Sequence, residues 1–446
     1  MGERSSNIIN RDDKVIGTSM KIRLFPLVAD KASGCTITDV DGKEYLDFSA
    51  NWAVANIGYG NPDIIKAISE QVQKNSFASF ATTITEPTVE LAEKLVDKLQ
   101  TNYDKKVWFG LSGSDANDCI FKLVPLATGR RRFISYFGSY HGQTIGSLTL
   151  SGHTAQAKFI GSGAVTKIPY PYCYRCLFRK EYESCNLMCL DYLENEVFTY
   201  LSPPEDTGAI IIEAIQCDGG VIPAPINYLQ RLREICDKHN IYLIFDEVKI
   251  GVGRTGKFFG FEYAEIEPDA VIFGKPIASG MPLSGVVGRS NILDAGVATH
   301  LLTTAGNPVS ATAGIATLEV IEKGNLMANA IDVGKYMKDK LESLKDRYQI
   351  VGDVRGKGLV VGLEIVKDKN TKEPAPRETA KITFQAFQNG LIIPYVGVYS
   401  NVLEFTPPLM LNKAQVDEGI AKLESAIDDV EKGKISEKDI ERFTGW

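Results

Sequence analysis

The stretch that decides the fold is residues 241–256, which read IYLIFDEVKIGVGRTG. Five apolar residues run directly into Asp246 and Glu247. A short apolar run of this kind is typical of a strand buried in a parallel sheet. Carboxylates at the carboxyl end of such a strand lie where α/β folds bind ligands. A plain strand-end turn needs no pair of acids, so we interpret Asp246 and Glu247 as functional. A buried carboxylate could hold a heteroaromatic nitrogen in its protonated form, because its negative charge favours the cation.

The same pattern continues on both sides of this strand. Further short apolar strands are predicted at residues 106–111, 133–135, 209–212 and 270–273, and an amphipathic helix is predicted at 228–239. Strands that alternate with helices form βαβ units, whose sheet is mostly parallel. The sequence therefore predicts an α/β fold with a mostly parallel central sheet.

A lysine lies within the most apolar part of this region. Residues 271–283 read VIFGKPIASGMPL and place Lys275 directly beyond a predicted strand. A lysine in so apolar a segment is costly unless something uses it. Desolvation lowers the pKa of a lysine, and the neutral amine can then form a Schiff base with a carbonyl compound. We therefore expect Lys275 to be catalytic.

Two weaker motifs follow earlier strands. Residues 111–115 read LSGSD at a strand-to-helix junction, where free N–H groups favour a phosphate, although such turns are common. Residues 139–142 read SYHG and place Tyr140 at a strand end, where its ring could stack on a flat ligand. Taken alone, Tyr140 is better explained as a core residue.

The outer parts of the chain have a different pattern. Residues 35–47 read as a hairpin around Asp41-Gly42, and helices are expected at 62–76 and 87–99. Beyond residue 310 we expect two long helices, then strands at 350–366, 391–394 and 402–406, and a closing helix at 413–432. We predict an N-terminal arm and small sheet (1–60), a large α/β domain (61–310) and a C-terminal α/β domain (311–446).

Composition sets the broad class. The 446 residues carry 49 Lys and Arg against 56 Asp and Glu, a net charge of −7, and 44% are hydrophobic. This is ordinary globular usage, and the mild acidity gives no basic surface for nucleic acid or an anionic membrane. The polar N-terminus lacks the apolar core of a signal peptide, and no stretch predicts a membrane helix. A cytoplasmic protein is the expectation.

Together these features are the parts of a pyridoxal phosphate (PLP) enzyme: a phosphate seat, a stacking aromatic ring, a carboxylate for a ring nitrogen and a Schiff-base lysine. Their order, SGSDAND, SYHGQT, DEVKIGVGRTG, FGKPIASGMPLS and TTAGNP, resembles that of class III aminotransferases, which are fold type I PLP enzymes. The resemblance extends from DVDGKEYLDF into the C-terminal part. It implies a large domain with a mostly parallel sheet and a smaller α/β C-terminal domain.

The resemblance also implies a role for each matching residue. Lys275 carries PLP as a Schiff base, and Asp246 pairs with the pyridine nitrogen. The other cofactor-binding positions are Val248 behind the ring, Tyr140 on its other face, Gly113 and Ser114 at the phosphate, and Thr304 reaching the phosphate bound by the neighbouring subunit. The last of these implies a homodimer, or a higher oligomer, with active sites at the subunit interface.

Three positions depart from the usual aminotransferase pattern. In IEAIQCDGG, residues 212–220, Asp218 replaces a glutamate, and in NVLEFTPPL, residues 401–409, Glu404 stands where an arginine binds the substrate carboxylate. A switchable Glu/Arg ion pair has thus become two acids, and Glu404 would repel 2-oxoglutarate. Lys249 occupies the place of a glutamine that faces the phenolic oxygen of PLP.

These variants resemble the racemase branch of the family, typified by α-amino-ε-caprolactam racemase and, less closely, isoleucine 2-epimerase. The match includes IGTSMKIRLFPL, KEPAPRETAK and the terminal FTGW. Proteins of the epimerase type retain the arginine, so Glu404 favours the lactam type. A neutral lactam or amide has no carboxylate that needs an arginine.

Racemisation requires a proton to return to Cα from the face opposite to the one it left, which indicates two acid–base groups. We predict Lys275 on one face and Asp218 on the other, with Tyr140 assisting. Glu404 and Trp52 are the candidate substrate residues. An aminotransferase that moves an amino group to a 2-oxo acid is the main alternative, and a PLP-binding protein without turnover is a lesser one.

Four cysteines lie close together in the sequence: Cys173, Cys176, Cys185 and Cys189. Their spacing is compatible with a structural zinc site, with two disulfides, or with reduced thiols on an insertion. Because they lie outside the expected catalytic parts, we assign them to stability, and no catalytic metal is expected.

Overall fold

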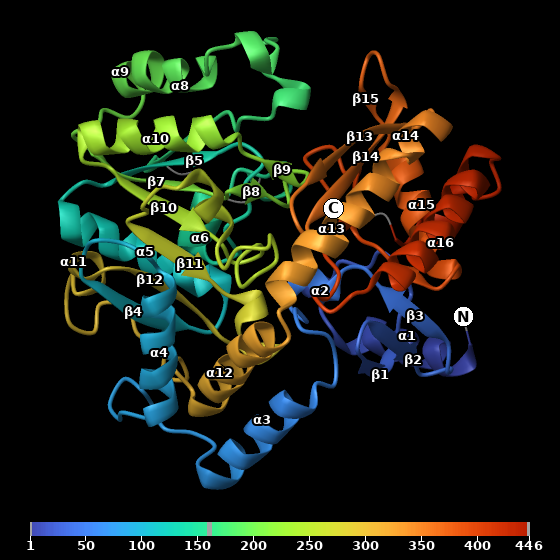
Figure 1. The fold of residues 1–446 in the computed structure, drawn as a ribbon, viewed down its shortest axis with the longest axis horizontal. Helices are drawn as coiled ribbons and strands as arrows, with labels where there is room; N and C mark the ends of the chain where they lie inside the picture. Colours follow the sequence, from blue (N-terminus) through green and yellow to red (C-terminus); the bar gives the residue numbers. More distant parts are fainter. Residues whose placement is uncertain (1, 158–162, 444–446) are drawn as a thin grey trace. The chain divides into compact units, whose positions relative to one another are not determined.

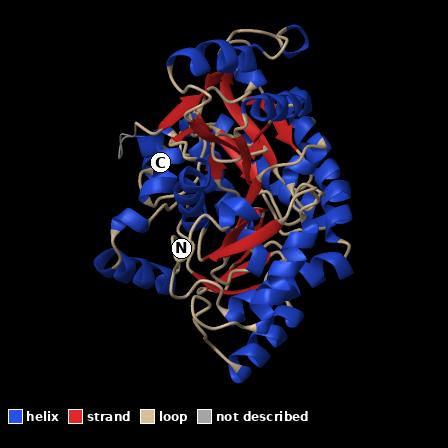
Figure 2. Ribbon diagram, turned by 90° about the vertical axis from the view of Figure 1, so that its left-hand side faces the viewer, coloured by secondary structure: helices blue, strands red, loops and turns tan. Residues whose placement is uncertain are grey.

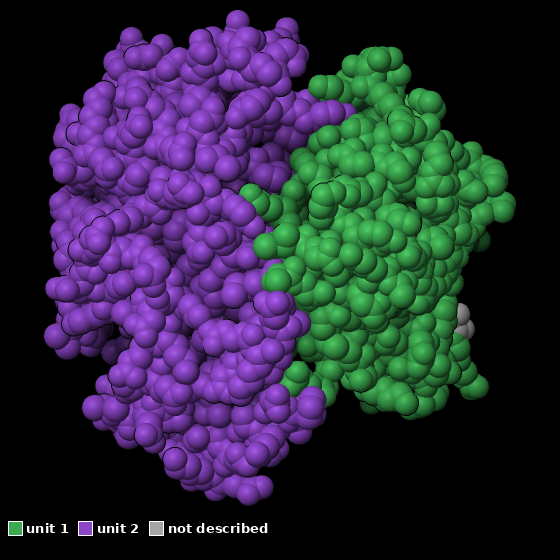
Figure 3. Space-filling model, in the orientation of Figure 1, with its two compact units in different colours: residues 1–61, 328–446 green, residues 62–327 purple. Residues whose placement is uncertain are grey.

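A computed structural model of the protein describes residues 2–157 and 163–443. The chain divides into two compact units (Figure 3). Unit 1 comprises residues 1–61 and 328–446, and unit 2 comprises residues 62–327. Of the FTGW run, residues 444–446 lie outside the described part.

Unit 2 is built on a seven-stranded sheet with strand order β4-β12-β11-β10-β7-β5-β6 (Figure 1). Its strands are β4 (Lys105–Gly110), β5 (Arg132–Tyr136), β6 (Val165–Ile168), β7 (Thr207–Ile212), β10 (Tyr242–Asp246), β11 (Ala270–Phe273) and β12 (Ser284–Arg289). All run parallel except β12, which is antiparallel to both of its neighbours. The predicted mostly parallel sheet is confirmed, and each of the five predicted strands lies in it.

Helices cover both faces of this sheet. Side chains alternate between the two faces of a strand, so a strand can pack against helices on both sides. Ile244 of β10 belongs to a core cluster with the apolar side of α5 (Gly113–Thr128), including Ile120. Tyr136 of β5 points to the other face, where its hydroxyl accepts a hydrogen bond at 3.0 Å from Tyr228 of α10 (Ile226–His239). The strands are therefore buried on both sides, as their continuous apolar runs predict.

The remaining helices of unit 2 precede, connect or follow the strands of the sheet along the chain. They include α3 (Pro62–Lys74), α4 (Glu86–Lys98), α6 (Ile145–Leu150), α8 (Met188–Tyr192) and α12 (Pro308–Lys323). Helices, drawn in blue, flank the strands, drawn in red (Figure 2). Among the described residues, no helix is long and apolar enough to cross a membrane.

Unit 1 contains two small sheets. One has β1 (Ala29–Ser33), β2 (Thr36–Asp39), β3 (Glu44–Asp47) and β16 (Leu391–Ile392), and the other has β13 (Val351–Gly356), β14 (Val361–Asp368), β15 (Glu373–Pro374), β17 (Tyr395–Val396) and β18 (Val402–Phe405). Its helices include α1 (Glu3–Val15), α13 (Leu326–Glu342), α15 (Pro376–Gln388) and α16 (Lys413–Glu431). The expected hairpin is the antiparallel pair β2 and β3.

The first and last parts of the chain share one sheet. Strand β16 pairs in parallel with β3, with Leu391 opposite Leu46. The sequence division treated 1–60 and 311–446 as separate parts, whereas contacts gather them into unit 1. It also began the C-terminal part at residue 311, whereas α12 lies within unit 2 and contacts α3 and α4.

Candidate active site

The candidate functional residues of unit 2 lie at or beyond the ends of strands that finish at one edge of the sheet. Strands β4, β5, β7, β10 and β11 run parallel, so their carboxyl ends meet at this edge. The segments beyond them carry Gly113, Tyr140, Asp218, Asp246 and Lys275. This edge is where open α/β folds bind their ligands.

Asp246 ends β10 and its carboxylate is held by three donors. The side-chain amide of Asn117 donates to Oδ2 at 3.0 Å, Nδ1 of His141 lies 2.7 Å from the same oxygen, and the backbone N–H of Val248 donates to Oδ1 at 3.1 Å. Asp246 is only 5% exposed. These contacts fix the orientation of a buried carboxylate, as a partner for a protonated ring nitrogen requires.

Asn117 and His141 were not among the predicted site residues. Asn117 lies on α5, and His141 follows the predicted stacking residue Tyr140 in the SYHG motif. The motif itself was a signal, because a histidine beside a candidate site residue can orient a carboxylate. Neither side chain could be paired with Asp246 from the sequence, since 129 and 105 residues separate them from it.

The adjacent Glu247 has a structural position instead. Its side chain is fully buried and accepts hydrogen bonds from the backbone N–H groups of Gly260 at 2.8 Å and Phe261 at 3.0 Å. Burial raises the pKa of Glu247 to about 8. The expectation that both acids serve the site therefore needs correction, because Glu247 anchors the turn at Gly260–Ala264.

The start of α5 provides a seat for an anion. Ser112 and Asp115 form a capping box, in which the Ser112 hydroxyl accepts from the N–H of Asp115 and the Asp115 carboxylate accepts from the N–H of Ser112. Gly113 and Ser114 occupy the first turn, where helix N–H groups and the helix dipole favour negative charge. The Ser114 hydroxyl also accepts from the N–H of Gln143 at 3.1 Å, which joins the SYHG segment to this turn.

Val248 lies against two of these turns. A Cβ added to Gly113 would come within 2.8 Å of the Val248 side chain, and one added to Gly274 within 3.3 Å. Only glycine allows this close an approach at residue 113. Val248 thus joins the turns that follow β4, β10 and β11. Its role as the wall behind a flat ring stays a prediction.

Lys275 begins a short turn, Lys275–Ala278, directly after β11. Its backbone has φ +32°, a region that residues other than glycine rarely adopt. Strain of this kind persists where surrounding structure enforces it, and it concentrates at functional sites. The side chain is half-buried, consistent with an amine that must meet a ligand.

Asp218 lies in the turn between β8 (Ile215–Gln216) and β9 (Ile222–Pro223), and its Oδ2 is 3.7 Å from Nζ of Lys249. Burial alone would raise the pKa of Asp218, but the charges of Lys249, Lys275 and His153 hold it below its ordinary value. Burial and the charge of Asp218 raise the pKa of Tyr140. Lys249, Lys275 and Tyr140 therefore share an electrostatic environment with Asp218.

Three predicted positions lie outside this group. Thr304 is exposed in the loop before α12. Trp52 and Glu404 belong to unit 1. Trp52 is half-buried in a turn of four consecutive left-handed residues, 50–53, and Glu404 is fully buried on β18 opposite Gly362 of β14.

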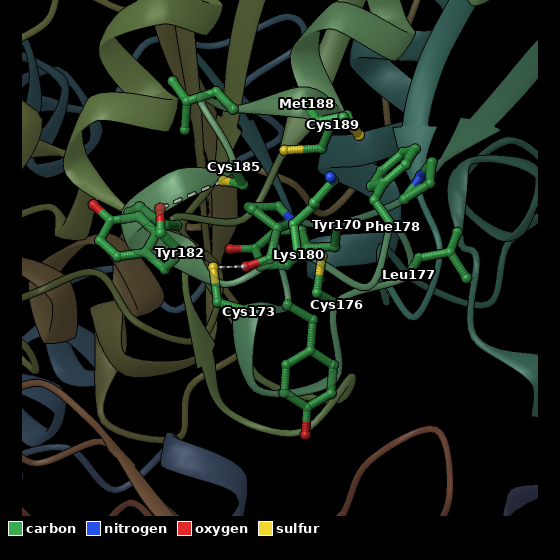
Figure 4. A pocket seen from close by; sticks show the side chains of 15 residues that line it. Tyr170, Cys173, Cys176, Leu177, Phe178, Lys180, Tyr182, Cys185, Met188 and Cys189 are labelled. Atoms are coloured by element: carbon green, nitrogen blue, oxygen red, sulfur yellow. Dashed lines mark hydrogen bonds between the residues drawn. The ribbon is translucent and has the colours of Figure 1, made fainter.

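One pocket of unit 2 is lined by all four clustered cysteines, Cys173, Cys176, Cys185 and Cys189 (Figure 4). All four are free thiols. Cys173 donates to the carbonyl oxygen of Pro171 at 3.7 Å, and Cys185 donates to that of Tyr182 at 3.5 Å. Within residues 2–157 and 163–443, no group of three or more His, Cys, Asp or Glu side chains could hold a metal ion. A structural role for the four thiols stays a prediction.

The residues at the sheet edge fit a phosphorylated pyridine cofactor. Asp246 offers a fixed carboxylate, the first turn of α5 offers N–H groups, and Val248 offers an apolar wall. Nε2 of His141 and Oδ1 of Asn117 are buried without a hydrogen-bond partner, which marks the surroundings of Asp246 as built for a ligand or water. Lys275 supplies the amine.

Residues 18–427 match the family profile described as aminotransferase class-III. The chain belongs to this family. An alanine/serine racemase of Pyrococcus horikoshii is 40% identical over 98% of this chain and 93% of that protein. An isoleucine 2-epimerase of Lentilactobacillus buchneri is 38% identical over 100% and 99%. A 4-aminobutyrate aminotransferase, GabT of Escherichia coli, is 36% identical over 91% and 95%.

Solved structures of the family share the fold. A Bacillus anthracis aminotransferase matches with a TM-score of 0.88 at 31% identity, over 96% of this chain and 99% of that one. An amine transaminase of an uncultivated Pseudomonas species, in a PLP-bound form, matches with a TM-score of 0.84 at 30% identity, over 90% and 94%. The predicted class III family, its racemase branch and the fold type I architecture are confirmed.

Proposed function

We propose that the protein is a PLP-dependent racemase or epimerase that inverts Cα of a neutral amino acid or of its amide or lactam, of the α-amino-ε-caprolactam type. The observation that carries the proposal is a second buried ionisable group, Asp218, within electrostatic reach of Lys275. Inversion needs two acid–base groups, and these two residues supply them. The racemase and epimerase relatives at 38–40% identity support this choice.

The residues at the sheet edge would hold PLP, which when bound withdraws electrons from Cα of the attached substrate. Gly113 and Ser114 would hold its phosphate, Asp246 its ring nitrogen, and Val248 and Tyr140 its two faces. Lys249 would lie toward its phenolic oxygen. Lys275 would form the covalent link and exchange the Cα proton on one face of the substrate.

Asp218 would exchange the proton on the opposite face. Its lowered pKa keeps it a carboxylate at neutral pH, ready to accept the proton of one enantiomer. Tyr140, whose pKa is raised by burial and by Asp218, stays a neutral donor that can assist the return of the proton. For the other enantiomer the roles of Lys275 and Asp218 reverse.

Glu404 and Trp52 would contact the substrate. Because Glu404 is an acid where the family commonly has an arginine, it would disfavour a dicarboxylate acceptor. The alternative is an aminotransferase of the 4-aminobutyrate or ornithine type, which the similarity to GabT supports. We further propose a homodimer in the cytoplasm, in which exposed Thr304 reaches the phosphate bound by the partner subunit.

One incubation separates the two functions. The holoenzyme is given a single pure enantiomer of a neutral amino acid, an amino acid amide or α-amino-ε-caprolactam, with and without a 2-oxo acid. We expect optical activity to disappear without the acceptor. Product formation that depends on the acceptor would instead identify an aminotransferase.

Asp218→Ala should block inversion but preserve proton exchange through Lys275. In deuterated water the variant should exchange the Cα proton of one enantiomer with retention, while racemisation falls by about 100-fold or more. Chiral chromatography with mass spectrometry measures both. The control is Asp237→Ala, at an exposed aspartate of α10 that pairs with Arg233. Normal inversion by Asp218→Ala would remove Asp218 from the reaction.

A further inference from the structure

Lys249 and Asp218 form an ion pair in which both side chains are buried. The lysine is 6% exposed and the aspartate 9%, and 3.7 Å separates Nζ from Oδ2. Lys249 follows β10 three residues beyond Asp246, whereas Asp218 lies on the β8–β9 turn. Taking both charges out of water is costly, and removal of one partner leaves the other uncompensated. Such a pair in a candidate active site needs a reason beyond stability.

Several ionisable groups among the described residues of unit 2 interact electrostatically with Asp218. Lys249, Lys275 and His153 favour its ionised form. Burial raises the pKa of Tyr140, and burial with the charges of Asp246 and Asp218 raises the pKa of Glu213 well above its ordinary value, so both groups resist a further negative charge beside Asp218. The ionised form of Asp218 therefore depends on the nearby positive charges of Lys249, Lys275 and His153.

Among these cations, Lys249 forms an ion pair with the carboxylate, with Nζ 3.7 Å from Oδ2, and it has no covalent part in the proposed reaction. Under the proposed function, Lys275 links to the cofactor and then gives and takes a proton, so its charge changes within each turnover. Asp218 must nevertheless remain a base when Lys275 is neutral. An ammonium group 3.7 Å from Oδ2 favours the ionised carboxylate throughout.

We propose that Lys249 is a positioning residue, which keeps Asp218 ionised independently of the charge on Lys275 and so makes it the base for one enantiomer. This inference rests on the proposed function of Asp218. It assigns the lysine of the DEVK motif to the second base, in addition to any contact with the cofactor. Lys249 itself need not exchange a proton with the substrate.

The test uses Lys249→Met, which removes the charge but keeps the chain length, and Lys249→Arg, which restores a charge. Cα–H exchange is measured for each enantiomer as a function of pH. Loss of the cation raises the pKa of Asp218. In the pH profile of the enantiomer whose proton Asp218 removes, the acid limb should therefore move up by about one to two pH units. Lys249→Arg should return this acid limb toward its wild-type position. The pH profile of the enantiomer whose proton Lys275 removes should keep its acid limb at the wild-type position.

A second readout does not depend on turnover. Thermal unfolding of the full chain is followed with cofactor bound and after its removal, for Lys249→Met, Asp218→Asn and the double variant. We expect the effects to be non-additive, with Lys249→Met destabilising less when Asp218 is already neutral. Lys167→Met, the same change at a partly buried lysine of β6, is the control and should add to Asp218→Asn.

These results separate failure of the inference from failure of the proposed function. If wild-type enzyme does not racemise, the proposed function is wrong. If it racemises through Asp218 but Lys249→Met leaves both the acid limb and the additivity unchanged, the inference alone is wrong. A changed cofactor spectrum with an unchanged acid limb would likewise overturn it and place Lys249 at the cofactor only.

Discussion

Lys275→Ala is expected to abolish turnover, with a fall of about 10⁴-fold or more, because one residue supplies both the covalent link and a proton-transfer group. The lysine begins the turn after β11 with a strained backbone, φ +32°, so its position is enforced by the fold. Alanine keeps the turn but lacks the amine. Cofactor binding should weaken and the absorbance of protein-linked cofactor should be lost.

The measurement combines racemisation of a pure enantiomer with the visible spectrum of the holoenzyme. Lys257→Ala, at an exposed lysine of the same unit, is the matched control and should behave as wild type. Added small amines should restore part of the lost proton transfer, since they replace the missing base. Normal activity of Lys275→Ala with an unchanged spectrum would show that another lysine carries the cofactor.

The site residues that could be predicted are those whose chemistry is visible in their own segment. An apolar run that ends in an acid places Asp246 at a strand end, and a lysine beyond the next strand places Lys275 at the same edge. Both positions follow from the rule that parallel strands share a carboxyl edge. The assignment of roles to Gly113, Val248 and Tyr140 depended on the family resemblance.

Contacts between distant segments could not be predicted in this way. Asn117 and His141 meet at Asp246 only because α5 and the segment after β5 reach the same sheet edge. Glu247 has the same sequence context as Asp246, but successive residues turn to opposite sides, and it binds the backbone at Gly260 instead.

The fold shows the same limit. Strand β12, Ser284–Arg289, was not predicted, because its two apolar residues are flanked by glycines and its stability comes from pairing with β4 and β11. The sharing of one sheet by β3 and β16 was not predicted either, since more than 300 residues separate the strands. A parallel pairing at such a distance leaves no local pattern in either strand.

Asp246→Asn is expected to leave PLP bound while Cα–H exchange falls by about two to four orders of magnitude. The amide occupies the same volume and can keep one acceptor for Asn117 or His141, so the pocket should persist. It lacks the negative charge that favours a protonated ring nitrogen. Cofactor titration measures binding. The rate of Cα–H exchange in deuterated water measures how strongly the bound cofactor withdraws electrons from Cα.

The adjacent acid offers a matched control. Glu247→Gln makes the same chemical change one residue away, but Glu247 accepts from the N–H groups of Gly260 and Phe261. Glutamine has one acceptor oxygen for two donors, so this variant should unfold more easily, by about 1–3 kcal/mol, yet exchange the Cα proton at nearly the wild-type rate once folded. The two variants thus separate charge at the cofactor from support of the fold. Exchange at the wild-type rate in Asp246→Asn would mean that another group protonates the ring, and His141, 2.7 Å from Asp246, would be the first to examine.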